Sequence, residues 1–516
     1  TQGVSSAASD VYKRQGQSQQ FIDVGMLRRL RSATLAAARG AVEPVSRQTY
    51  AEFLHRWHSI GDAEREDLLS VIEQLAGVPF PASAWETLIL PNRIPDYRPA
   101  DLDDLLATGE VIVQGQGVVG SNDVLVALLP ADIAPAIAAD SVETEPQLSM
   151  VATQLLDHMA GGGAFLAAEL TRTTGAEHKE VDDAIWELFD LGLITPDGFA
   201  SVRARLASGK ESGKTAHRAP RQNRGRGSTR RLRMGRTSFA QTARGGFGGE
   251  SLDRVRQRRA ALNAHRTVPG RWAAVEPLIA GEVTDTERAL LRSEAWINRY
   301  GVVTRGAVMG EKSPGGFAEA YRVLSAWEDS GVVLRGYIID GLGGAQFAPR
   351  DVISQLRRME DDQHAEPTEP VLLAAADVAN PFGAALPWPE ADGAHLGRGA
   401  GALVVLSEGR CIAYLTCGGR NITTFAAPSF ADEGGGGAGA GAGPSGGAAS
   451  GGTRGVDGGS PATISGIISA LTTAIRAGRL SPVVIERING HNVMDVPTRE
   501  WIAAGARLTP KGLSIK

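Results

Sequence analysis

A pattern of several helices followed by two strands occurs three times in this sequence, and no other feature limits the fold as strongly. The helix predicted at 98–109 has Pro99 near its start and Gly109 at its end, as helix punctuation requires. The first occurrence has apolar residues at helical spacing over 49–60, 64–77, 81–94 and 98–109, then alternating runs at 110–117 and 123–130.

The same order returns twice. The second occurrence has predicted helices at 148–162, 164–175 and 177–194 and a turn-containing wing at 195–203. The third has predicted helices at 285–301, 304–312 and 315–331 and a hairpin at 332–349. Helices that end in a hairpin are the order of a winged-helix domain, so we predict winged helices at 45–140, 145–205 and 271–360.

The spacing of apolar residues changes near residue 368, where strand-like runs replace predicted helices. We therefore predict an α+β fold: tandem winged-helix domains followed by a C-terminal β-barrel-like module at 368–516, with a Gly-rich insertion at 434–452. Residues 21–44 are expected to include a basic helix. Residues 1–20 are expected to be disordered and are left out of the fold prediction, because "SSAASDVYKRQ" resembles a translated sequencing adapter.

Composition excludes several classes of protein. Cys411 and Cys417 are too few for a disulfide framework or a zinc site, and the histidines show no metal-binding spacing, so no metal site is predicted. There is no apolar run near 18 residues and no signal peptide. We expect a cytoplasmic, nucleoid-associated protein with no membrane partner.

The net charge of −5 conceals a strongly basic tract. Between 203 and 236 many Arg and Lys side chains are opposed only by Glu211, and we expect 206–270 to be a disordered basic linker. Arginines interleaved with glycines are typical of segments that hold nucleic-acid backbones, although a solvated linker is the alternative. The candidate nucleic-acid contacts in this tract are Lys210, Lys214, Arg221, Arg224, Arg226, Arg230 and Arg231.

The third winged helix adds two candidate contacts. The helix at 315–329 occupies the recognition position, but its apolar face is expected to belong to the core. Arg335 in the wing and Gln346 at the end of the wing loop are the better candidates, because a guanidinium binds phosphate and an amide can donate to a base edge. A structural role in the turn is the alternative for Gln346.

Two glycine motifs resemble nucleotide-binding loops without meeting their requirements. "SGKESGKT" (208–215) has one residue too few between its glycines, and neither a buried strand nor a helix flanks it. "GQGVVG" (115–120) is followed by a strand-like run, whereas a dinucleotide site needs a helix there. We expect its glycines to form the tip of a hairpin.

Long stretches of the sequence resemble the C-terminal half of the large helicase-related proteins (Lhr). The resemblance runs in order from about residue 26 to the end of the chain. It is carried by composite segments such as "VPFPASAWETLILPNRIPDYRPADLDDLLATGEVIVQGQG", "GGFAEAYRVLSAWEDSGVVLRGYIIDGLGGAQFAPRDVISQLR", "NPFGAALPWP" and "LTPKGLSIK".

The resemblance implies an ATP-dependent 3′-to-5′ DNA helicase of superfamily 2, linked to DNA repair. Its two motor domains, with their ATP and Mg²⁺, are expected N-terminal to the present chain, and no cofactor is expected in the chain itself. The implied partners are single-stranded DNA or a DNA/RNA hybrid and the helicase domains in cis. A homo-oligomer is also compatible with the family.

Whether this chain is itself an enzyme stays open, because the same resemblance implies a second class of function. The family's C-terminal region resembles winged-helix DNA glycosylases that remove alkylated bases, and members have been associated with uracil removal, so the implied activity is excision of uracil or of an alkylated base. A glycosylase needs a carboxylate beside a flipped base, and Asp377 and Asp495 are the candidates, with turn or capping roles as the alternatives. A winged-helix transcription regulator is disfavoured, because no ligand domain is visible.

Overall fold

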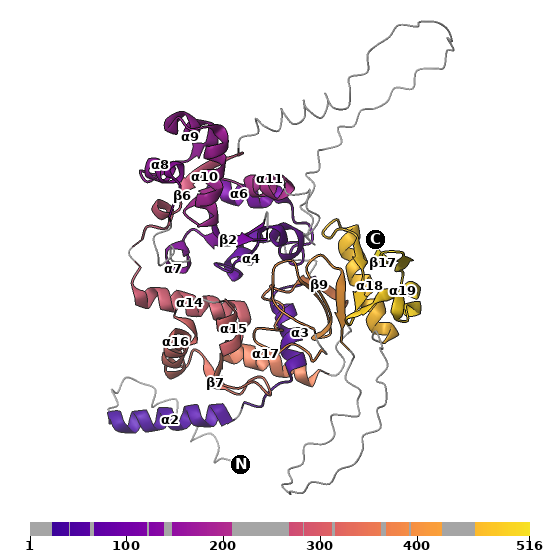
Figure 1. Cartoon of the computed structure of the whole chain (residues 1–516). Helices are drawn as coiled ribbons and strands as arrows, with labels where there is room; N and C mark the ends of the chain where they lie inside the picture. The colour runs from indigo at the N-terminus through magenta and orange to yellow at the C-terminus, as the bar shows by residue number, and fades with distance from the viewer. Residues whose placement is uncertain are drawn as a thin grey trace, which may run out of the picture.

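The structure is a computed structural model that describes residues 23–40, 42–61, 67–120, 123–138, 147–208, 268–281, 283–311, 315–362, 368–391, 394–425 and 460–516. Figure 1 shows three winged-helix units and a C-terminal strand-rich module arranged around α3 and β9. A single large cluster of buried apolar side chains includes residues from all four parts. None of the described helices is long and apolar enough to cross a membrane.

The first unit has the predicted order of helices and hairpin. Helix α3 begins at Ser46, whose hydroxyl accepts a hydrogen bond from the Thr49 amide at 3.1 Å. The predicted hairpin around "GQGVVG" is confirmed, because the strands before and after it pair antiparallel. The elements are α3 (Arg47–Trp57), α4 (Leu68–Gln74), β1 (Phe80–Pro81), α5 (Ala82–Ala84), η1 (Trp85–Ile89), α6 (Pro99–Thr108), β2 (Val111–Val119), β3 (Asp123–Pro130) and α7 (Ala134–Ile137).

The second unit differs from its predicted boundaries in one respect. Its elements are α8 (Met150–Met159), β4 (Phe165–Leu166), α9 (Ala167–Thr174), α10 (His178–Asp190), β5 (Ile194–Pro196), α11 (Ala200–Ser208), β6 (Arg271–Ala274) and α13 (Glu276–Ile279). Strand β6 lies between β4 and β5 in one sheet. The basic tract was expected to link two domains. Because β6 follows the tract in sequence and pairs with β5, the tract is an insertion within the second unit.

Trp272 shows why β6 belongs to the second unit. Its ring is fully buried and meets Phe189 and Trp186 of α10 edge-on, with centroid distances of 5.6 and 5.4 Å. Edge-to-face aromatic packing of this kind stabilises a core beyond the area that it buries. The unit therefore closes its core only with a strand that comes after the tract.

Glycines let the first two units approach closely. A Cβ atom added at Gly115 in β2 would lie 1.9 Å from the carbonyl oxygen of Phe189 in α10. The "GQGVVG" motif thus serves a hairpin and a domain contact, and Gly117 has the positive φ of 98° that such a hairpin needs.

The third unit is the most regular winged helix. Its elements are α14 (Asp285–Tyr300), α15 (Arg305–Glu311), α16 (Gly316–Ser330), β7 (Leu334–Gly336), β8 (Gln346–Ala348) and α17 (Arg350–Asp361). Thr284 and Glu287 form a reciprocal capping box at the start of α14. Strands β7 and β8 pair antiparallel as the predicted wing.

The C-terminal module contains two sheets, and the expected barrel is not confirmed. The strands of the larger sheet follow the order β15-β14-β12-β11-β10-β9 and those of the smaller the order β13-β17-β16, and in the described residues neither sheet closes on itself. The Gly-rich segment 434–452 lies outside the described residues. The elements are β9 (Val371–Ala374), β10 (Leu403–Ser407), β11 (Arg410–Leu415), β12 (Asn421–Thr424), α18 (Pro461–Arg476), β13 (Val483–Ile485), β14 (Arg487–Ile488), β15 (His491–Asn492), η3 (Val493–Asp495), α19 (Arg499–Ala503), β16 (Arg507–Thr509) and β17 (Gly512–Ile515).

The predicted basic helix is α2 (Val24–Gly40), which lies against the third unit beside β7 (Figure 1). The chain that follows it is held by the wing, because Val45 forms a parallel β-bridge with Ile339. Segments about three hundred residues apart in sequence therefore lie side by side.

Candidate nucleic-acid interface

The recognition helix and the wing of the third unit meet at Tyr321 and Arg335. The Arg335 guanidinium lies 5.8 Å from the centre of the Tyr321 ring, and its Nη1 donates a hydrogen bond to the Tyr321 hydroxyl at 2.5 Å. The Tyr321 ring packs edge-on against buried Phe347 with a centroid distance of 5.6 Å. The core therefore fixes an aromatic ring and a cation together at the surface.

Both groups keep exposed surface, and the Nε atom of Arg335 also lies 3.5 Å from the Glu328 carboxylate. Tyr321 is 40% exposed, and the Arg335 side chain is 29% exposed. Tyr337, directly after β7 and two residues from Arg335, is 69% exposed and adds a second exposed tyrosine to the wing region. Aromatic faces that stack on bases and guanidiniums that bind phosphates are the usual elements of single-strand binding.

Glu328 connects this surface to helix α2. It accepts two hydrogen bonds from Arg39, at 2.6 Å from Nε and 2.5 Å from Nη2, and a third from the Arg335 amide at 3.2 Å. The Glu328 side chain is only 2% exposed. Since a buried carboxylate needs cationic partners, this arrangement holds the end of α2 beside the wing.

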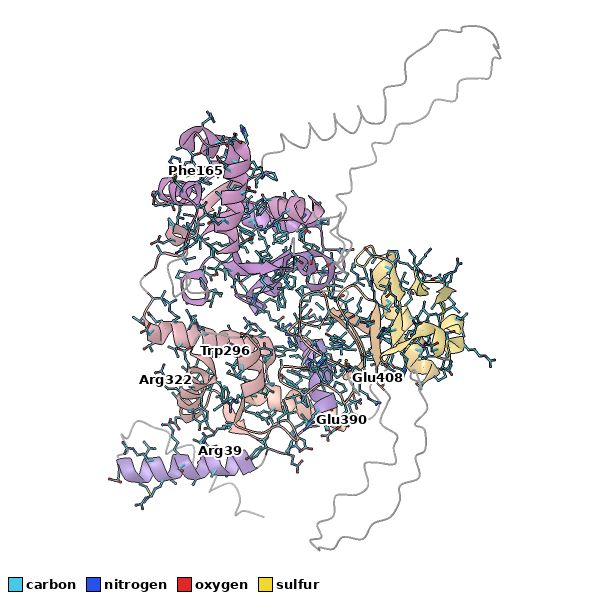
Figure 2. All side chains as sticks on the ribbon, viewed as in Figure 1. Arg39, Phe165, Trp296, Arg322, Glu390 and Glu408 are labelled. Atoms are coloured by element: carbon cyan, nitrogen blue, oxygen red, sulfur yellow. The ribbon has the colours of Figure 1, made fainter. Side chains whose placement is uncertain are left out.

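Helix α2 adds positive charge to the same unit. It contains Arg28, Arg29, Arg31 and Arg39 and no acidic residue, and the first three are exposed. Figure 2 labels Arg39 near the end of α2 and Arg322 on α16 of the third unit. A helix of this composition attracts phosphate groups through Coulomb forces and counterion release.

Gln346 does not belong to this surface. Its side chain is 1% exposed; the amide oxygen accepts hydrogen bonds from the Ile338 and Ile339 amides, and Nε2 donates to the Ile339 carbonyl at 3.1 Å. The prediction that it contacts a base edge is corrected, because its polar groups hold the wing loop together.

Asp377 lies in the interior and is removed as a catalytic candidate. It forms two hydrogen bonds with the Arg93 guanidinium, at 2.7 and 3.1 Å, and neither side chain has any exposed surface. Burial alone would raise the pKa of Asp377, but the attraction of Arg93 outweighs it and the pKa is lowered. The carboxylate therefore joins the first unit to the C-terminal module and has no access to a substrate.

Asp495 is exposed and lies far from Asp377, the other predicted catalytic residue. It ends η3, and the residue at the N-terminus of α19 is Thr498, so the capping role considered for Asp495 is not observed. Asp377 follows β9 and Asp495 follows β15, at opposite edges of the six-stranded sheet. Strands in a sheet are about 4.8 Å apart, which separates the two carboxylates far beyond the range of a shared site.

The seven basic residues predicted within the tract lie outside the described residues. They are Lys210, Lys214, Arg221, Arg224, Arg226, Arg230 and Arg231. The strands on either side of the tract belong to the wing sheet of the second unit. Sequence reasoning missed Tyr337, two residues after Arg335, and Arg39, which shares Glu328 with Arg335. The exposed Tyr in "LRGYIID" was the available signal for the first.

The described residues contain no group of His, Cys, Asp and Glu side chains that could hold a metal ion. Residues 45–131 and 282–368 each match a winged-helix domain model of the large helicase-related protein. These ranges agree with the first and third units of the structure.

Two curated proteins are similar to most of this chain. "Lhr helicase/ probable uracil glycosylase" from Mycolicibacterium smegmatis is 39% identical over 96% of this chain and 30% of its own length. "Lhr helicase/uracil glycosylase" from Escherichia coli is 35% identical over 77% of this chain and 26% of its own length. The chain thus spans less than a third of either relative.

One solved structure, the DNA glycosylase AlkZ of Streptomyces sahachiroi, covers 86% of this chain and 100% of its own. Its TM-score is 0.42 at 13% identity, which is too low to support an argument about fold or function.

Proposed function

We propose that this chain is the C-terminal nucleic-acid-binding region of an Lhr-type ATP-dependent helicase. The observation that carries the proposal is the Arg335–Tyr321–Tyr337 surface, with basic helix α2 docked beside it, in a domain that matches the Lhr winged-helix type. The partner is single-stranded DNA or the exposed strand of a DNA/RNA hybrid.

The surface would act on a strand in two ways. Tyr321 and Tyr337 present ring faces on which bases of any sequence stack, and Arg335 and the α2 arginines bind the phosphates between them. The basic residues between α11 and β6 in sequence would add a further set of phosphate contacts. Binding is therefore tolerant of sequence and strongly dependent on salt.

The motor lies elsewhere in the parent protein under this proposal. ATP and Mg²⁺ act in helicase domains joined in cis, and the present chain positions the strand and contributes to assembly of an oligomer. No nucleotide is needed for the binding step itself.

The deciding experiment measures the binding of the chain to a fluorescent oligothymidylate by anisotropy from 50 to 300 mM NaCl, together with ATP hydrolysis in the presence of DNA. We expect a steep fall in affinity with salt and no ATPase activity. Weak, salt-insensitive binding or DNA-stimulated ATPase activity would contradict the proposal.

A DNA glycosylase is the second candidate, favoured by the words "uracil glycosylase" in the names of both relatives. Such an enzyme needs a carboxylate that reaches water and the flipped base. Of the two predicted carboxylates only Asp495 is exposed, so the test compares uracil excision by the wild type and by Asp495→Asn. Absence of excision by the wild type excludes the activity, and equal excision by both excludes Asp495.

A further inference from the structure

A cleft of about 1200 Å³ lies between the first winged-helix unit and the C-terminal module. Its walls come from α3, from the segment between η1 and α6, from the start of β9 and from the C-terminal end of α18. In Figure 1 α3 and β9 lie near the centre of the molecule, and α18 lies beside β9.

Arg479 crosses this cleft and is held by a chain of hydrogen bonds. Its Nη1 donates to Oδ1 of Asn92, and Nδ2 of Asn92 donates to the carbonyl oxygen of Leu372 at 2.9 Å. Asn92 is only 6% exposed, so its amide orientation is set by Leu372. Residues from three segments that are distant in sequence therefore fix the orientation of the Arg479 guanidinium.

The charge of Arg479 is not balanced by a carboxylate among the described residues. Other buried arginines have one: Arg93 pairs with Asp377, Arg203 with Glu86, and Arg299 with Glu311. Burial lowers the pKa of Arg479, and no attraction to an acidic group opposes this effect. A half-buried guanidinium without a counter-charge is costly unless an anion binds to it.

The surroundings also favour an anionic ligand. Arg56 and Arg476 line the same cleft and are exposed. Of the acidic groups there, Glu86 is already hydrogen-bonded to Arg203 and Tyr97, and Glu52 lies 3.4 Å from Arg56. Exposed Glu369 is the remaining acidic side chain in the lining. Because Arg56 pairs with Glu52 and Glu86 pairs with Arg203, two guanidiniums, of Arg476 and Arg479, remain against the single carboxylate of Glu369.

His55 supplies an independent sign of a ligand. Its side chain lines the cleft and is 7% exposed, and its Nε2 atom has no hydrogen-bond partner. Buried polar atoms are nearly always paired, and an exception points to a missing partner. Burial lowers the pKa of His55 to about 4, so the ring is neutral near pH 7 and contributes a hydrogen-bonding group but no charge.

We infer that this cleft binds a phosphate group of a nucleic-acid strand, with Arg479, oriented by Asn92, as its principal contact. The inference rests on the proposed function and gives it a second site, whose lining includes none of Tyr321, Arg335 and Tyr337. The same chemistry would accept free phosphate or a mononucleotide, and the experiment separates these sources from a strand.

The test compares the affinity for a fluorescent oligothymidylate of the wild type and of Arg479→Gln at several salt concentrations. We expect Arg479→Gln to weaken binding about tenfold, as loss of one charged hydrogen bond does, and to reduce the slope of log K against log salt by about 0.7. Arg487→Gln is the matched control, because Arg487 is exposed on β14 outside the cleft; it should change the affinity less than about twofold.

A second pair of variants does not alter the arginine. Thr473→Glu places a carboxylate in the lining of the cleft, whereas Ala462→Glu makes the same charge change at an exposed position near the other end of α18. Thr473→Glu should weaken strand binding and Ala462→Glu should not. Thermal unfolding of each variant checks that the fold is retained.

The outcomes separate the inference from the proposed function. If the wild type binds the strand and neither Arg479→Gln nor Thr473→Glu changes its affinity or salt slope, the inference is wrong and the proposed function stands. If the wild type binds no strand, the proposed function fails, and a test with inorganic phosphate decides whether the cleft binds an anion. In that case thermal unfolding is compared in phosphate and in chloride at equal ionic strength. If phosphate stabilises the wild type but not Arg479→Gln, the cleft is a site for free phosphate. Equal effects on both overturn the site.

Discussion

Arg93 and Asp377 form an ion pair with an Nη2–Oδ1 distance of 2.7 Å and no exposed surface on either side chain. Arg93 follows η1 in the first unit, and Asp377 follows β9 in the C-terminal module. Asp377 also accepts a hydrogen bond from the Ala379 amide at 2.9 Å. The pair therefore fixes the relative placement of two parts that sequence reasoning treated as separate domains.

Asp377→Ala should destabilise the fold severely, because it leaves the Arg93 guanidinium buried without a counter-charge. We expect a loss of about 3–5 kcal/mol in the free energy of unfolding, measured by urea denaturation. The control is Glu43→Ala, which removes the exposed partner of Arg357 and should cost less than about 1 kcal/mol. Similar losses for the two variants would contradict the importance of the buried pair.

The stability of the chain should fall as the pH is lowered from 7 to 5. Burial lowers the pKa of His58, with the charge of Arg93 acting in the same direction, and burial lowers the pKa of His55 to about 4. Between the ordinary value near 6.5 and the lowered value, the unfolded chain binds protons that the folded chain does not, so acid favours unfolding. Each histidine contributes up to about 1.4 kcal/mol per pH unit in this window.

The test measures urea unfolding at pH 7, 6 and 5. His55→Gln and His58→Gln should each reduce the pH dependence, whereas His491→Gln, at an exposed position, should not. The Asp377 carboxylate acts in a different window: its lowered pKa stabilises the fold above its unfolded pKa, and this contribution is lost only below about pH 4. An unchanged slope in both buried-histidine variants would disprove the assignment.

Glu328→Ala should weaken binding to single-stranded DNA although it removes a negative charge. Without Glu328, Arg39 loses the contact that holds α2 beside the wing, and Arg335 loses a carboxylate 3.5 Å from its Nε. We expect a loss of affinity of about three- to tenfold, because two contacts lose their fixed positions. Asp329→Ala removes an exposed neighbouring charge and should leave affinity unchanged or raise it. Tighter binding by Glu328→Ala would contradict the arrangement.

Gly115→Ala should disrupt the contact between the first two units. The added methyl group would lie 1.9 Å from the Phe189 carbonyl oxygen, which forces β2 and α10 apart. We expect a destabilisation of about 1–3 kcal/mol, measured as a fall in the unfolding midpoint. Gly161→Ala, where an added Cβ meets nothing within 4 Å, is the control and should be nearly neutral.

Local patterns in the sequence were sufficient for the elements of the winged helices. Helical spacing, Pro99 and Gly109 placed α6, and alternation on both sides of "GQGVVG" predicted the hairpin of β2 and β3. The wing position of Arg335 followed from the same reasoning. These features depend on residues a few positions apart, and their periodicity is visible in the chain itself.

The tertiary structure alone decided which distant residues meet. It paired β6 with β5 across the basic tract, buried Asp377 against Arg93 and Gln346 inside its loop, and left the strands of the C-terminal module as two sheets. It also brought Arg479 to Asn92. Polar residue types at turns look alike in sequence whether they end in the core or at the surface. For Asp377 and Arg479 the partners lie hundreds of residues away in sequence, and for Gln346 they are backbone groups of its own loop; no local periodicity records any of them.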